Sequence, residues 1–459
     1  MNSTISPHIF RAYDIRGIYQ QDIDSLLFYN VGVAAGSYVR REMKGQTMTA
    51  GNDLRRSSHT LAHALISGIA ASGIDVVYTG TTSFGQTLFS GWKNNMDLIA
   101  FVTASHLPAE WNGVKFYYGD GVGLPEEELM KIRDITIKNE GKQVAWKQLG
   151  SIKTMDPVET YQEFFVKNFT FNKTIRVALD CGGASMTCSA PSLLNTMGLD
   201  VVPVYCDPDP TFSQRPSDPK PENLKTLVSA VKEKNCDFGV AFDGDGDRSV
   251  IVDDSGYILS ADQTGIVIGK HGLKKKSGTI IANVECSKAV TEQLTPLGYT
   301  VKKIQVGHTF LTLHAKKEQA LLGIESSGHL ILPNYFLFDD ALIIPLKIAE
   351  IIDTNDTSLS LLRKEIPMYP RVKLEIKCSD ETKFTVIKQV KEDLQKKYSD
   401  CNTMDGIRVN VNNGWILIRA SNTSPIIRLT SEADTEKQAR EIATTFKKKT
   451  EQIINQHQL

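Results

Sequence analysis

Short apolar runs alternate with longer segments of helical periodicity along most of the chain. The runs predict strands at residues 47–51, 98–103, 175–180, 238–242, 280–284 and 301–306. Residues 221–235 have Pro near the start and apolar side chains at helical spacing (Leu224, Leu227, Ala230 and Val231), which predicts a helix that packs against the following strand. Because strands alternating with helices are typical of mixed, largely parallel sheets covered by helices, we expect α/β domains.

The last ninety or so residues have a different pattern. Residues 371–378 alternate apolar and polar side chains, and Asn413-Gly414 between runs at 407–411 and 415–418 predicts a two-residue hairpin. The order strand, helix, hairpin, strand and terminal helix indicates a separate α+β domain. Polar or Pro-containing segments near 153, 257 and 368 then predict the domains 1–153, 154–257, 258–368 and 369–459.

Composition and charge limit the possible functional classes. The 459 residues include 52 basic and 53 acidic ones, so no bulk positive potential favours nucleic acid or an anionic membrane. We find no signal-peptide core and no apolar stretch long enough to cross a bilayer. The seven cysteines form neither a CxxC pair nor a dense disulfide framework, so they should be reduced and serve mostly in packing. We expect a cytoplasmic protein, a monomer or a dimer, that binds neither nucleic acid nor membrane.

An aspartate loop follows the strand predicted at residues 238–242. Residues 243–248 read Asp-Gly-Asp-Gly-Asp-Arg, which puts three hard oxygen donors on one tight turn: Asp243, Asp245 and Asp247. Mg²⁺ prefers such oxygens, and a metal held by three side chains keeps positions open for water or a phosphoryl oxygen. The EF-hand calcium loop is excluded, because its sixth position requires Gly and its twelfth Glu, where this chain has Arg248 and Asp254. Taken alone, the loop is also compatible with a solvated turn.

Ser105 follows the strand predicted at residues 98–103, at the kind of strand end where open α/β sheets carry their active sites. Residues 103–115 read Thr-Ala-Ser-His-Leu-Pro-Ala-Glu-Trp-Asn-Gly-Val-Lys. A serine there is usually a turn former or helix N-cap, but the polar residues around it, His106 and Lys115 among them, favour a nucleophile. Lys115 could return beside Ser105 through the Pro-containing turn, where its ammonium would steady phosphate charge or its neutral form would accept the hydroxyl proton. A lysine lying along the surface is the alternative.

Two further polar loops carry side chains suited to a phosphosugar. Residues 323–329 read Gly-Ile-Glu-Ser-Ser-Gly-His, a set able to hold adjacent sugar hydroxyls while His329 assists proton transfer. Residues 419–428 read Arg-Ala-Ser-Asn-Thr-Ser-Pro-Ile-Ile-Arg, where two guanidiniums bracket hydroxyl and amide side chains, as suits a phosphate. Each loop taken alone is also compatible with an ordinary turn or hairpin.

Five ordered segments together carry a resemblance over essentially the whole chain. They are residues 10–17, which read Phe-Arg-Ala-Tyr-Asp-Ile-Arg-Gly, the Ser105 loop, the aspartate loop, and the segments 323–329 and 419–428. In this order they resemble those of the α-D-phosphohexomutases, closest to the phosphomannomutase/phosphoglucomutase group. The resemblance implies three α/β domains with mixed sheets and a C-terminal α+β domain around a central cleft.

The resemblance also implies a role for each residue of the site. The implied catalytic residues are Arg16, Ser105, His106, Lys115 and His329. Ser105 would carry a phosphate in the active form, and the implied ligands of Mg²⁺ are Ser105, Asp243, Asp245 and Asp247. The implied substrate-binding residues are Tyr13, Arg248, His308, Glu325, Ser327, Arg419, Ser421, Asn422, Thr423 and Arg428.

The reaction implied is that of an isomerase, an intramolecular phosphotransferase that interconverts hexose 1-phosphate and hexose 6-phosphate of mannose, glucose or both. Phosphorylated Ser105 would give its phosphoryl group to the sugar, forming a hexose 1,6-bisphosphate that turns end over end and returns the other phosphate. Positioning and charge neutralisation do most of the work in such transfers. Among enzymes, the first alternative is a phosphoglucosamine mutase and the second is a metal-dependent phosphatase. The alternative that is not an enzyme is a non-catalytic phosphosugar-binding protein.

Overall fold

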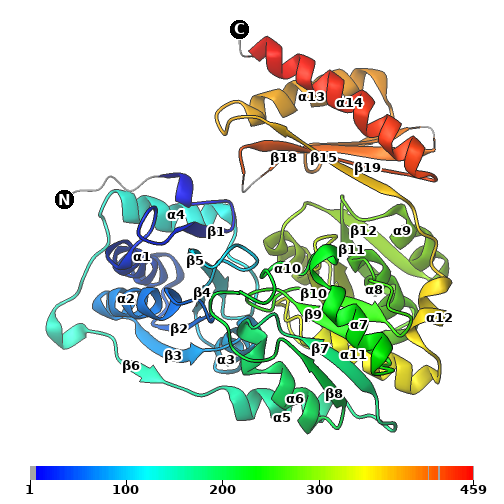
Figure 1. Cartoon of the computed structure of the whole chain (residues 1–459). Helices are drawn as coiled ribbons and strands as arrows, with labels where there is room; N and C mark the ends of the chain where they lie inside the picture. The colour runs from blue at the N-terminus through cyan, green and yellow to red at the C-terminus, as the bar shows by residue number, and fades with distance from the viewer. Residues whose placement is uncertain (1–6, 412, 422–423, 458–459) are drawn as a thin grey trace.

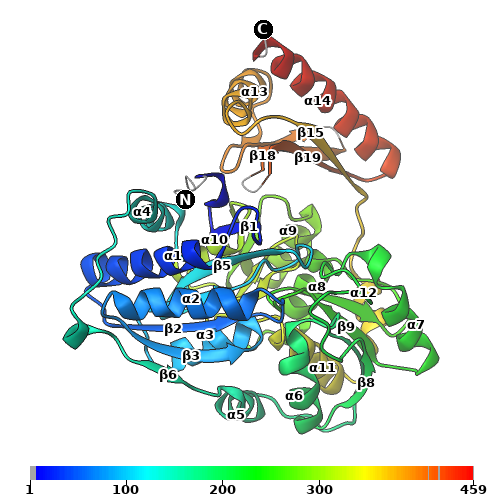
Figure 2. The ribbon, with the colours of Figure 1, turned by 60° about the vertical axis from the view of Figure 1, so that its left-hand side comes forward.

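Four domains make up the chain in this computed structural model, which describes residues 7–411, 413–421 and 424–457. Three α/β domains lie side by side, and the C-terminal domain lies against them, joined by a single segment (Figures 1 and 2). Mixed sheets in the first three domains and an antiparallel sheet in the fourth confirm the expected fold class. The domain boundaries stay a prediction, and the one near 153 falls within a strand that pairs with the first sheet.

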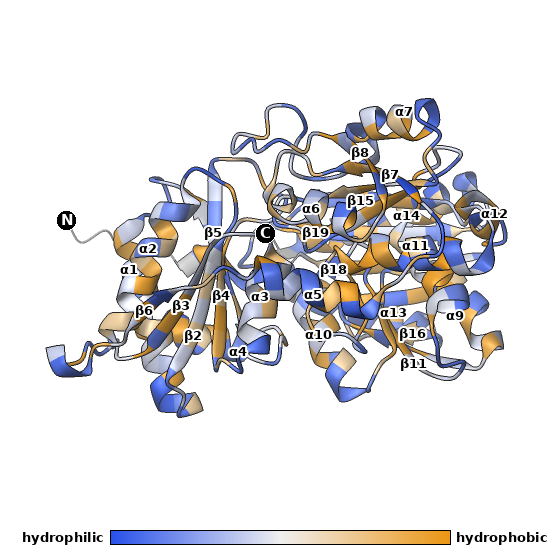
Figure 3. Ribbon diagram, turned by 90° about the horizontal axis from the view of Figure 1, so that it is seen from below, coloured by the Kyte–Doolittle hydropathy of each residue, from blue (hydrophilic) through white to orange (hydrophobic). Residues whose placement is uncertain are grey.

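The first domain is built on a six-stranded sheet with the order β1-β5-β4-β2-β3-β6. Its strands are β1 (Asp14–Ile18), β2 (Thr47–Asn52), β3 (Asp75–Thr81), β4 (Leu98–Val102), β5 (Trp111–Tyr118) and β6 (Ile152–Thr154). Its helices are α1 (Ser25–Tyr38), α2 (Ser58–Ala71), α3 (Phe84–Lys93) and α4 (Glu126–Ile137). Figure 3 shows α1 and α2 on one side of the sheet and α3 on the other. Strand β4 is buried on both faces, since alternate residues enter two different cores.

The second and third domains each have a four-stranded sheet, with the orders β10-β9-β7-β8 and β12-β11-β13-β14. The second contains α5 (Val158–Asn168), β7 (Arg176–Asp180), α6 (Ala190–Thr196), β8 (Asp200–Val204), α7 (Lys225–Glu233), β9 (Phe238–Phe242) and β10 (Ser249–Asp253). The third contains α8 (Ala261–Val267), β11 (Gly278–Asn283), α9 (Lys288–Leu294), β12 (Tyr299–Ile304), α10 (His308–Lys317), β13 (Leu322–Ile324), β14 (Leu330–Ile331), α11 (Ile343–Asn355) and α12 (Leu359–Lys364). In both sheets parallel pairs form the centre and one antiparallel hairpin forms an edge.

The fourth domain has an antiparallel sheet with the order β15-β19-β18-β17-β16, covered by two helices. Its elements are β15 (Arg371–Lys377), α13 (Lys383–Lys397), β16 (Cys401–Asn402), β17 (Ile407–Val411), β18 (Gly414–Ala420), β19 (Ile426–Ala433) and α14 (Glu436–His457). Its main core is separate from the cores of the other domains. By contrast, one large core runs through parts of the first three, from α3 to α12. Packing therefore joins the first three domains into one body, whereas a small apolar cluster of Val284, Trp415 and Leu417 joins the fourth to the third.

The predicted elements are found with shifted bounds. The predicted helix at 221–235 is a 3₁₀ turn at Pro221–Asn223 followed by α7, which packs on β7 and β9. The strands predicted at 280–284 and 301–306 begin two residues earlier, because pairing with neighbours extends them beyond their apolar runs. In the hairpin, Gly414 already pairs with Val411 as part of β18, so the predicted register was wrong by one residue. Within the described part of the chain, no helix has the length and apolar character needed to span a bilayer.

Candidate active site

The aspartate loop joins β9 to β10 and is completely enclosed. Asp243, Asp245 and Asp247 are at most 1% exposed, and one oxygen from each lies within 4.8 Å of the others. The glycines between them are required by close approaches, because a Cβ on Gly244 would lie 2.3 Å from the carbonyl oxygen of Ser105. The alternation of Asp and Gly thus serves two purposes, presenting three carboxylates and leaving room for the backbone of Ser105 and for Met186.

Ser105 lies directly against this loop, 138 residues away in sequence. Its hydroxyl donates a hydrogen bond of 2.9 Å to Asp243 Oδ2 and accepts one of 3.2 Å from Arg248 Nη2. The backbone of Ser105 has a positive φ of 50°, a strained conformation for a non-glycine residue, and its N–H donates to Thr103 Oγ1 at 2.8 Å. The structure therefore brings together the serine and the aspartates that the sequence singled out separately.

Arg55 holds the serine loop from behind, and the sequence analysis missed it. Its buried guanidinium donates to the carbonyl oxygens of Ser105 at 2.6 Å and Leu107 at 2.7 Å, and to that of Pro108. It also pairs with Asp53, whose Oδ2 lies 2.9 Å from Arg55 Nε. The only sequence signal was a charged Asn-Asp-Leu-Arg segment after a strand, and nothing local indicated that the arginine would be buried.

Lys115 returns along β5, opposite Phe101 of β4, but contacts the aspartates rather than the serine. Its ammonium lies 2.9 Å from Asp245 Oδ2 and 2.5 Å from Asp247 Oδ2, completely buried. Burial alone would lower the pKa of Lys115, but the two carboxylates outweigh it and raise that pKa above its ordinary value. Burial likewise opposes ionisation of Asp245, yet the lysine charge lowers its pKa to about 2. This arrangement favours the charged form of Lys115 over the neutral base that the sequence left open.

The same loop fits a divalent metal. Asp245 Oδ1 and Asp247 Oδ1 are buried without a hydrogen-bond partner, and both residues belong to the group of three aspartates that could hold a metal ion. Burial and the neighbouring carboxylates raise the pKa of Asp243 to about 7, a strain that a cation would relieve. All three donors are hard oxygens, the ligand type that Mg²⁺ prefers. The structure thus contains an acidic triad that could hold a metal next to Ser105.

Three imidazoles line the same cavity as Ser105 and differ in charge state. His329 Nδ1 lies 2.6 Å from Asp339 Oδ2, and although burial acts against it, Asp247 and Asp339 raise the pKa of His329 to about 9. The Arg248 charge and burial lower the pKa of His106, and burial lowers that of His308, so both are neutral. His308 Nδ1 lies 3.0 Å from the Tyr117 hydroxyl, and its ring stacks on His329. The site therefore holds one protonated imidazole that Asp339, which the sequence analysis missed, fixes in place.

The polar loop at residues 323–329, which begins in β13, is ordered by its own hydrogen bonds. Glu325 accepts one from Gly307 N at 2.9 Å and one from Ser327 Oγ at 2.6 Å. Its backbone N–H bonds to the carbonyl oxygen of His329 at 2.9 Å, which closes the loop. The two predicted sugar-binding side chains thus form one polar unit beside the imidazoles.

The segment 419–428 begins in β18 and ends in β19. Arg419 pairs with Asp405 at 2.9 Å, and Arg428 lies 3.7 Å from Glu375. Lys383, missed by the sequence analysis, donates to the carbonyl oxygens of Ser421 at 2.6 Å and Ser424 at 3.1 Å. Two more residues expected in this loop, Asn422 and Thr423, lie outside the described residues.

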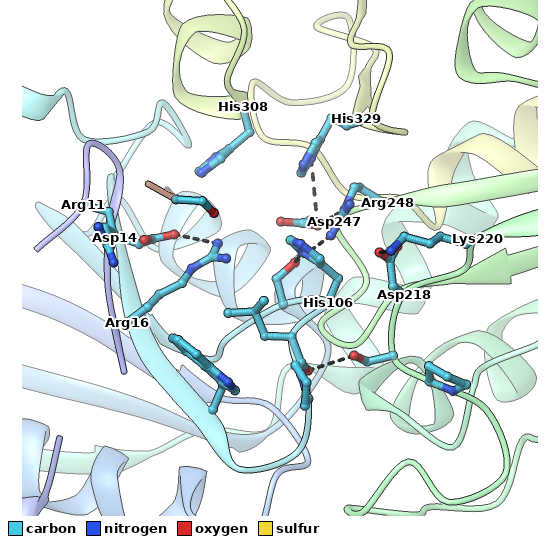
Figure 4. A pocket seen from close by; sticks show the side chains of 18 of the residues that line it. Arg11, Asp14, Arg16, His106, Asp218, Lys220, Asp247, Arg248, His308 and His329 are labelled. Carbon is cyan, nitrogen blue, oxygen red and sulfur yellow. Dashed lines mark hydrogen bonds and ion pairs between the residues drawn. The ribbon is translucent and has the colours of Figure 1, made fainter. Parts of the chain in front are cut away.

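Many of these residues line one cavity of about 1170 Å³ (Figure 4). The predicted residues that line it are Tyr13, Arg16, Ser105, His106, Lys115, Asp247, Arg248, His308, Glu325, Ser327, His329, Arg419, Ser421 and Arg428. Asp243 and Asp245 are fully buried and are not among the lining residues. Figure 4 also labels four lining residues that the sequence analysis did not select: Arg11, Asp14, Asp218 and Lys220. Asp14 orients Arg16 through an ion pair of 2.6 Å. The cavity combines the Ser105 side chain, Asp247 of the acidic triad and several cationic side chains, with residues contributed by all four domains.

Four family models match the chain in order. They are the phosphoglucomutase/phosphomannomutase α/β/α domains I, II and III, at residues 7–143, 159–256 and 260–369, and the C-terminal domain at 374–449. The chain belongs to the phosphoglucomutase/phosphomannomutase family. The expected resemblance is thereby confirmed.

Relatives of this family match over nearly the full length. A phosphomannomutase from Methanocaldococcus jannaschii is 34% identical, with 97% of each chain covered, and a phosphomannomutase/phosphoglucomutase from Pseudomonas aeruginosa is 31% identical over 97% of this chain and 96% of that protein. A "Probable phosphoglucosamine mutase" from Methanopyrus kandleri is 31% identical over 95% and 96%. A crystal structure of a family protein from Burkholderia thailandensis superposes with a TM-score of 0.90 at 26% identity, covering 98% of each chain. In this phosphoglucomutase/phosphomannomutase fold, the cavity at the meeting of the four domains is the candidate active site.

Proposed function

We propose that this protein is a phosphohexomutase that interconverts hexose 1-phosphates and hexose 6-phosphates of mannose, glucose or both. The observation that carries the proposal is the position of Ser105, whose hydroxyl lies 2.9 Å from Asp243 and 3.2 Å from Arg248 in a cavity lined with cations. A serine used only as a turn former would not need a buried acidic triad and a guanidinium at its hydroxyl. Relatives named as phosphomannomutase/phosphoglucomutase support the same reaction.

In the proposed cycle, phosphorylated Ser105 donates its phosphoryl group to a sugar hydroxyl and later accepts the second phosphate of a hexose 1,6-bisphosphate. Arg248 stabilises charge on the phosphoryl oxygens, because its Nη2 already bonds to the serine oxygen. Lys115, held protonated by two aspartates, fixes those aspartates beside the serine. A Mg²⁺ ion held by Asp243, Asp245 and Asp247, with Ser105 as a further ligand, would neutralise negative charge during the transfer.

His329 is the proposed proton donor and acceptor. Its raised pKa of about 9 keeps it protonated at neutral pH, so it can deliver a proton to a departing oxygen. Arg16 and His106 line the same cavity and are assigned with it to catalysis. Glu325 and Ser327 are assigned to the sugar hydroxyls, and Tyr13 and His308 to the cavity wall next to them.

The far end of the cavity is the proposed site for the phosphate that is not reacting. Arg419, Ser421 and Arg428 reach it from the fourth domain, whose core is separate from that of the other three. A bisphosphate that turns end over end needs more room than one bound sugar, and about 1170 Å³ exceeds the roughly 300–1,000 Å³ of ordinary ligand pockets. The whole cavity is thus assigned to one substrate in two orientations.

Phosphoglucosamine mutase is a second candidate, because several relatives at 31–32% identity carry that name. Mannose, glucose and glucosamine phosphates differ at carbon 2 alone, so the choice depends on how Glu325 and Ser327 sense that carbon. The purified protein should be given Mg²⁺, a trace of hexose 1,6-bisphosphate, and each of the three 1-phosphates in parallel. Fast conversion of the mannose and glucose substrates supports the proposal, whereas preference for glucosamine 1-phosphate supports the second candidate.

The role of Ser105 is tested by Ser105→Ala, with Ser192→Ala on an exposed part of α6 as the matched control. Turnover should vanish in Ser105→Ala while the melting temperature stays near that of the control, since the hydroxyl acts in chemistry rather than packing. Mg²⁺ binding should stay largely intact, because the three aspartate ligands remain. Turnover like that of the unmodified protein would refute the phosphoserine assignment. No conversion of any substrate by protein with phosphorylated Ser105 would instead favour a non-catalytic phosphosugar-binding protein.

A further inference from the structure

Two cysteines lie sulfur to sulfur at the ends of neighbouring strands of the second domain. Cys181 follows β7, Cys206 follows β8, and their Sγ atoms are 3.5 Å apart. The backbone holds them close, because Cys181 N–H donates to the carbonyl oxygen of Val204 at 3.3 Å and Tyr205 turns the chain with a positive φ of 48°. Both are free thiols in this structure, and the proposed phosphohexomutase reaction uses neither.

We propose that Cys181 and Cys206 form a redox-active pair that closes to a disulfide and thereby reduces turnover in the neighbouring active site. A disulfide has an S–S bond of roughly 2 Å, so the sulfurs need to approach by about 1.5 Å. Cys206 is partly exposed and Cys181 is completely buried. Cys206 is therefore the thiol that meets an oxidant, and Cys181 is the thiol that resolves it.

The acidities of the two thiols agree with this division. The hydrogen bond with Cys181 lowers the pKa of Cys206, whereas burial raises that of Cys181. Thiolate character and access decide which cysteine is oxidised first. Cys206 has both the lower thiol pKa and the greater exposure, so it is oxidised first.

The chemistry balances with hydrogen peroxide as the oxidant. The Cys206 sulfur takes one oxygen from the peroxide, giving a sulfenic acid and one water. The Cys181 sulfur then attacks the Cys206 sulfur, an S–S bond forms, and the hydroxyl leaves with the Cys181 proton as a second water. The two sulfurs together lose two electrons, and the peroxide is reduced to two waters.

The residues on both sides of Cys181 in the sequence connect the cysteine pair to the aspartate loop. Asp180 accepts hydrogen bonds from Gly182 N at 2.8 Å and Arg215 Nε at 3.0 Å. Arg215 in turn donates to the carbonyl oxygen of Phe242, the residue before Asp243, at 2.6 Å. Ser185 donates to the carbonyl oxygen of Gly244 at 2.9 Å. A shift of Cys181 toward Cys206 therefore pulls on both sides of the loop that supports Ser105.

Cys206 is connected to the cavity by a second route. It begins the segment 206–220, which lines the cavity with Phe212, Ser217 and Lys220 among others, and Ser217 donates to the carbonyl oxygen of Leu107 in the serine loop at 2.9 Å. The pair thus lies where the supports of the aspartate loop and of the cavity wall both begin. Formation of the Cys181–Cys206 disulfide should therefore alter the distance between the aspartate loop and the cavity wall formed by segment 206–220.

The experiment exposes the full-length protein to hydrogen peroxide, then counts free thiols under denaturing conditions and maps disulfide-linked peptides by mass spectrometry. We expect the count to fall by two, one peptide pair to link Cys181 with Cys206, and turnover to fall at least fivefold, with recovery after dithiothreitol. Cys206→Ser should keep its turnover under the same treatment. Cys236→Ser is the matched control, since it changes another cysteine of the same domain and should lose activity as the unmodified protein does.

Two results would overturn the proposal. An unchanged thiol count, or linkage of other cysteines, would show that the pair does not close, and this readout does not depend on any enzymatic activity. A Cys181–Cys206 disulfide with unchanged turnover would refute the connection to the active site. If Cys206→Ser does not fold, Cys181→Ala provides the same comparison, because the pair then lacks its resolving thiol.

Discussion

Replacing Arg55 with methionine should break the support of the serine loop. Methionine keeps an unbranched apolar stem in the buried space but removes every donor of the guanidinium. The carbonyl oxygens of Ser105 and Leu107, now bonded at 2.6 and 2.7 Å, would lose their partner, and the Asp53 carboxylate would lose an ion pair of 2.9 Å. The hydrogen bond that helps to hold Ser105 in its positive-φ conformation would then be lost.

The cost can be worked out from these contacts. Removing one partner of a buried ion pair costs about 3–5 kcal/mol, and each stranded buried carbonyl adds about 1–3 kcal/mol. These losses are not additive, since Asp53 can take up a proton and the carbonyls can turn toward the cavity. We expect the free energy of unfolding at neutral pH to fall by about 3–5 kcal/mol, a large part of the roughly 5–15 kcal/mol of an ordinary domain.

The deficit should depend on pH in a definite direction. Burial already raises the pKa of Asp53, and Arg55 is the largest influence that lowers it. Without Arg55 the folded-state pKa rises further above the unfolded value, so the folded variant holds its proton more tightly than the unfolded chain does. The variant is therefore destabilised least in acid. Its loss of stability relative to the unmodified protein grows as pH rises through the folded-state pKa of Asp53.

The assay is urea unfolding at pH 5 and pH 8 together with kcat and KM, and Arg56→Met is the matched control because Arg56 is the exposed neighbour. Arg55→Met should unfold at lower urea, with the larger deficit at pH 8, and kcat should fall more than KM changes because Ser105 is displaced. Equal unfolding midpoints and equal turnover in the two variants would refute the reasoning.

Three further perturbations test other buried charged groups. Lys115→Met should bind Mg²⁺ more than tenfold more tightly by calorimetry, because the buried ammonium no longer opposes the cation, and equal affinity would place the metal elsewhere. Burial raises the pKa of Asp340 to about 6, so stability should decline from about pH 4 to 6, and Asp340→Asn, which can still accept from Tyr161, should flatten that part of a melting-temperature profile. A melting-temperature profile unchanged by Asp340→Asn would contradict this role of Asp340. Lys383→Met should raise KM severalfold with little change in melting temperature, since its ammonium holds both ends of segment 421–424, and an unchanged KM would separate that segment from substrate binding.

Much of the fold could be predicted from local pattern. The apolar runs located β2, β4, β7 and β9 within about a residue, because burial on both faces produces short continuous hydrophobic segments. Element ends were less certain, as in β11 and β12, since strand pairing rather than side-chain polarity decides where a strand begins. The split of the predicted helix before β9 into a 3₁₀ turn and α7 was likewise not visible in the spacing.

The site divides in the same way. Ser105, the three aspartates and the loops at 323–329 and 419–428 stood out because their residue types are chemically unusual at strand ends. Arg55, Asp339 and Lys383 did not, since each acts on a segment remote from it in sequence or by fixing another side chain, and a lone charged residue has no local signature for such a partner. The charge of Lys115 also depended on neighbours 130 and 132 residues away.

The sequence by itself determined the alternation of strands and helices, the balanced charge and the chemical inventory of the site, because these follow from local composition and periodicity. Only the tertiary structure decided which groups meet, which are enclosed and what charge they carry. Coulomb interactions and desolvation depend on distance and burial, and these exist only once segments distant in sequence have packed around one cavity.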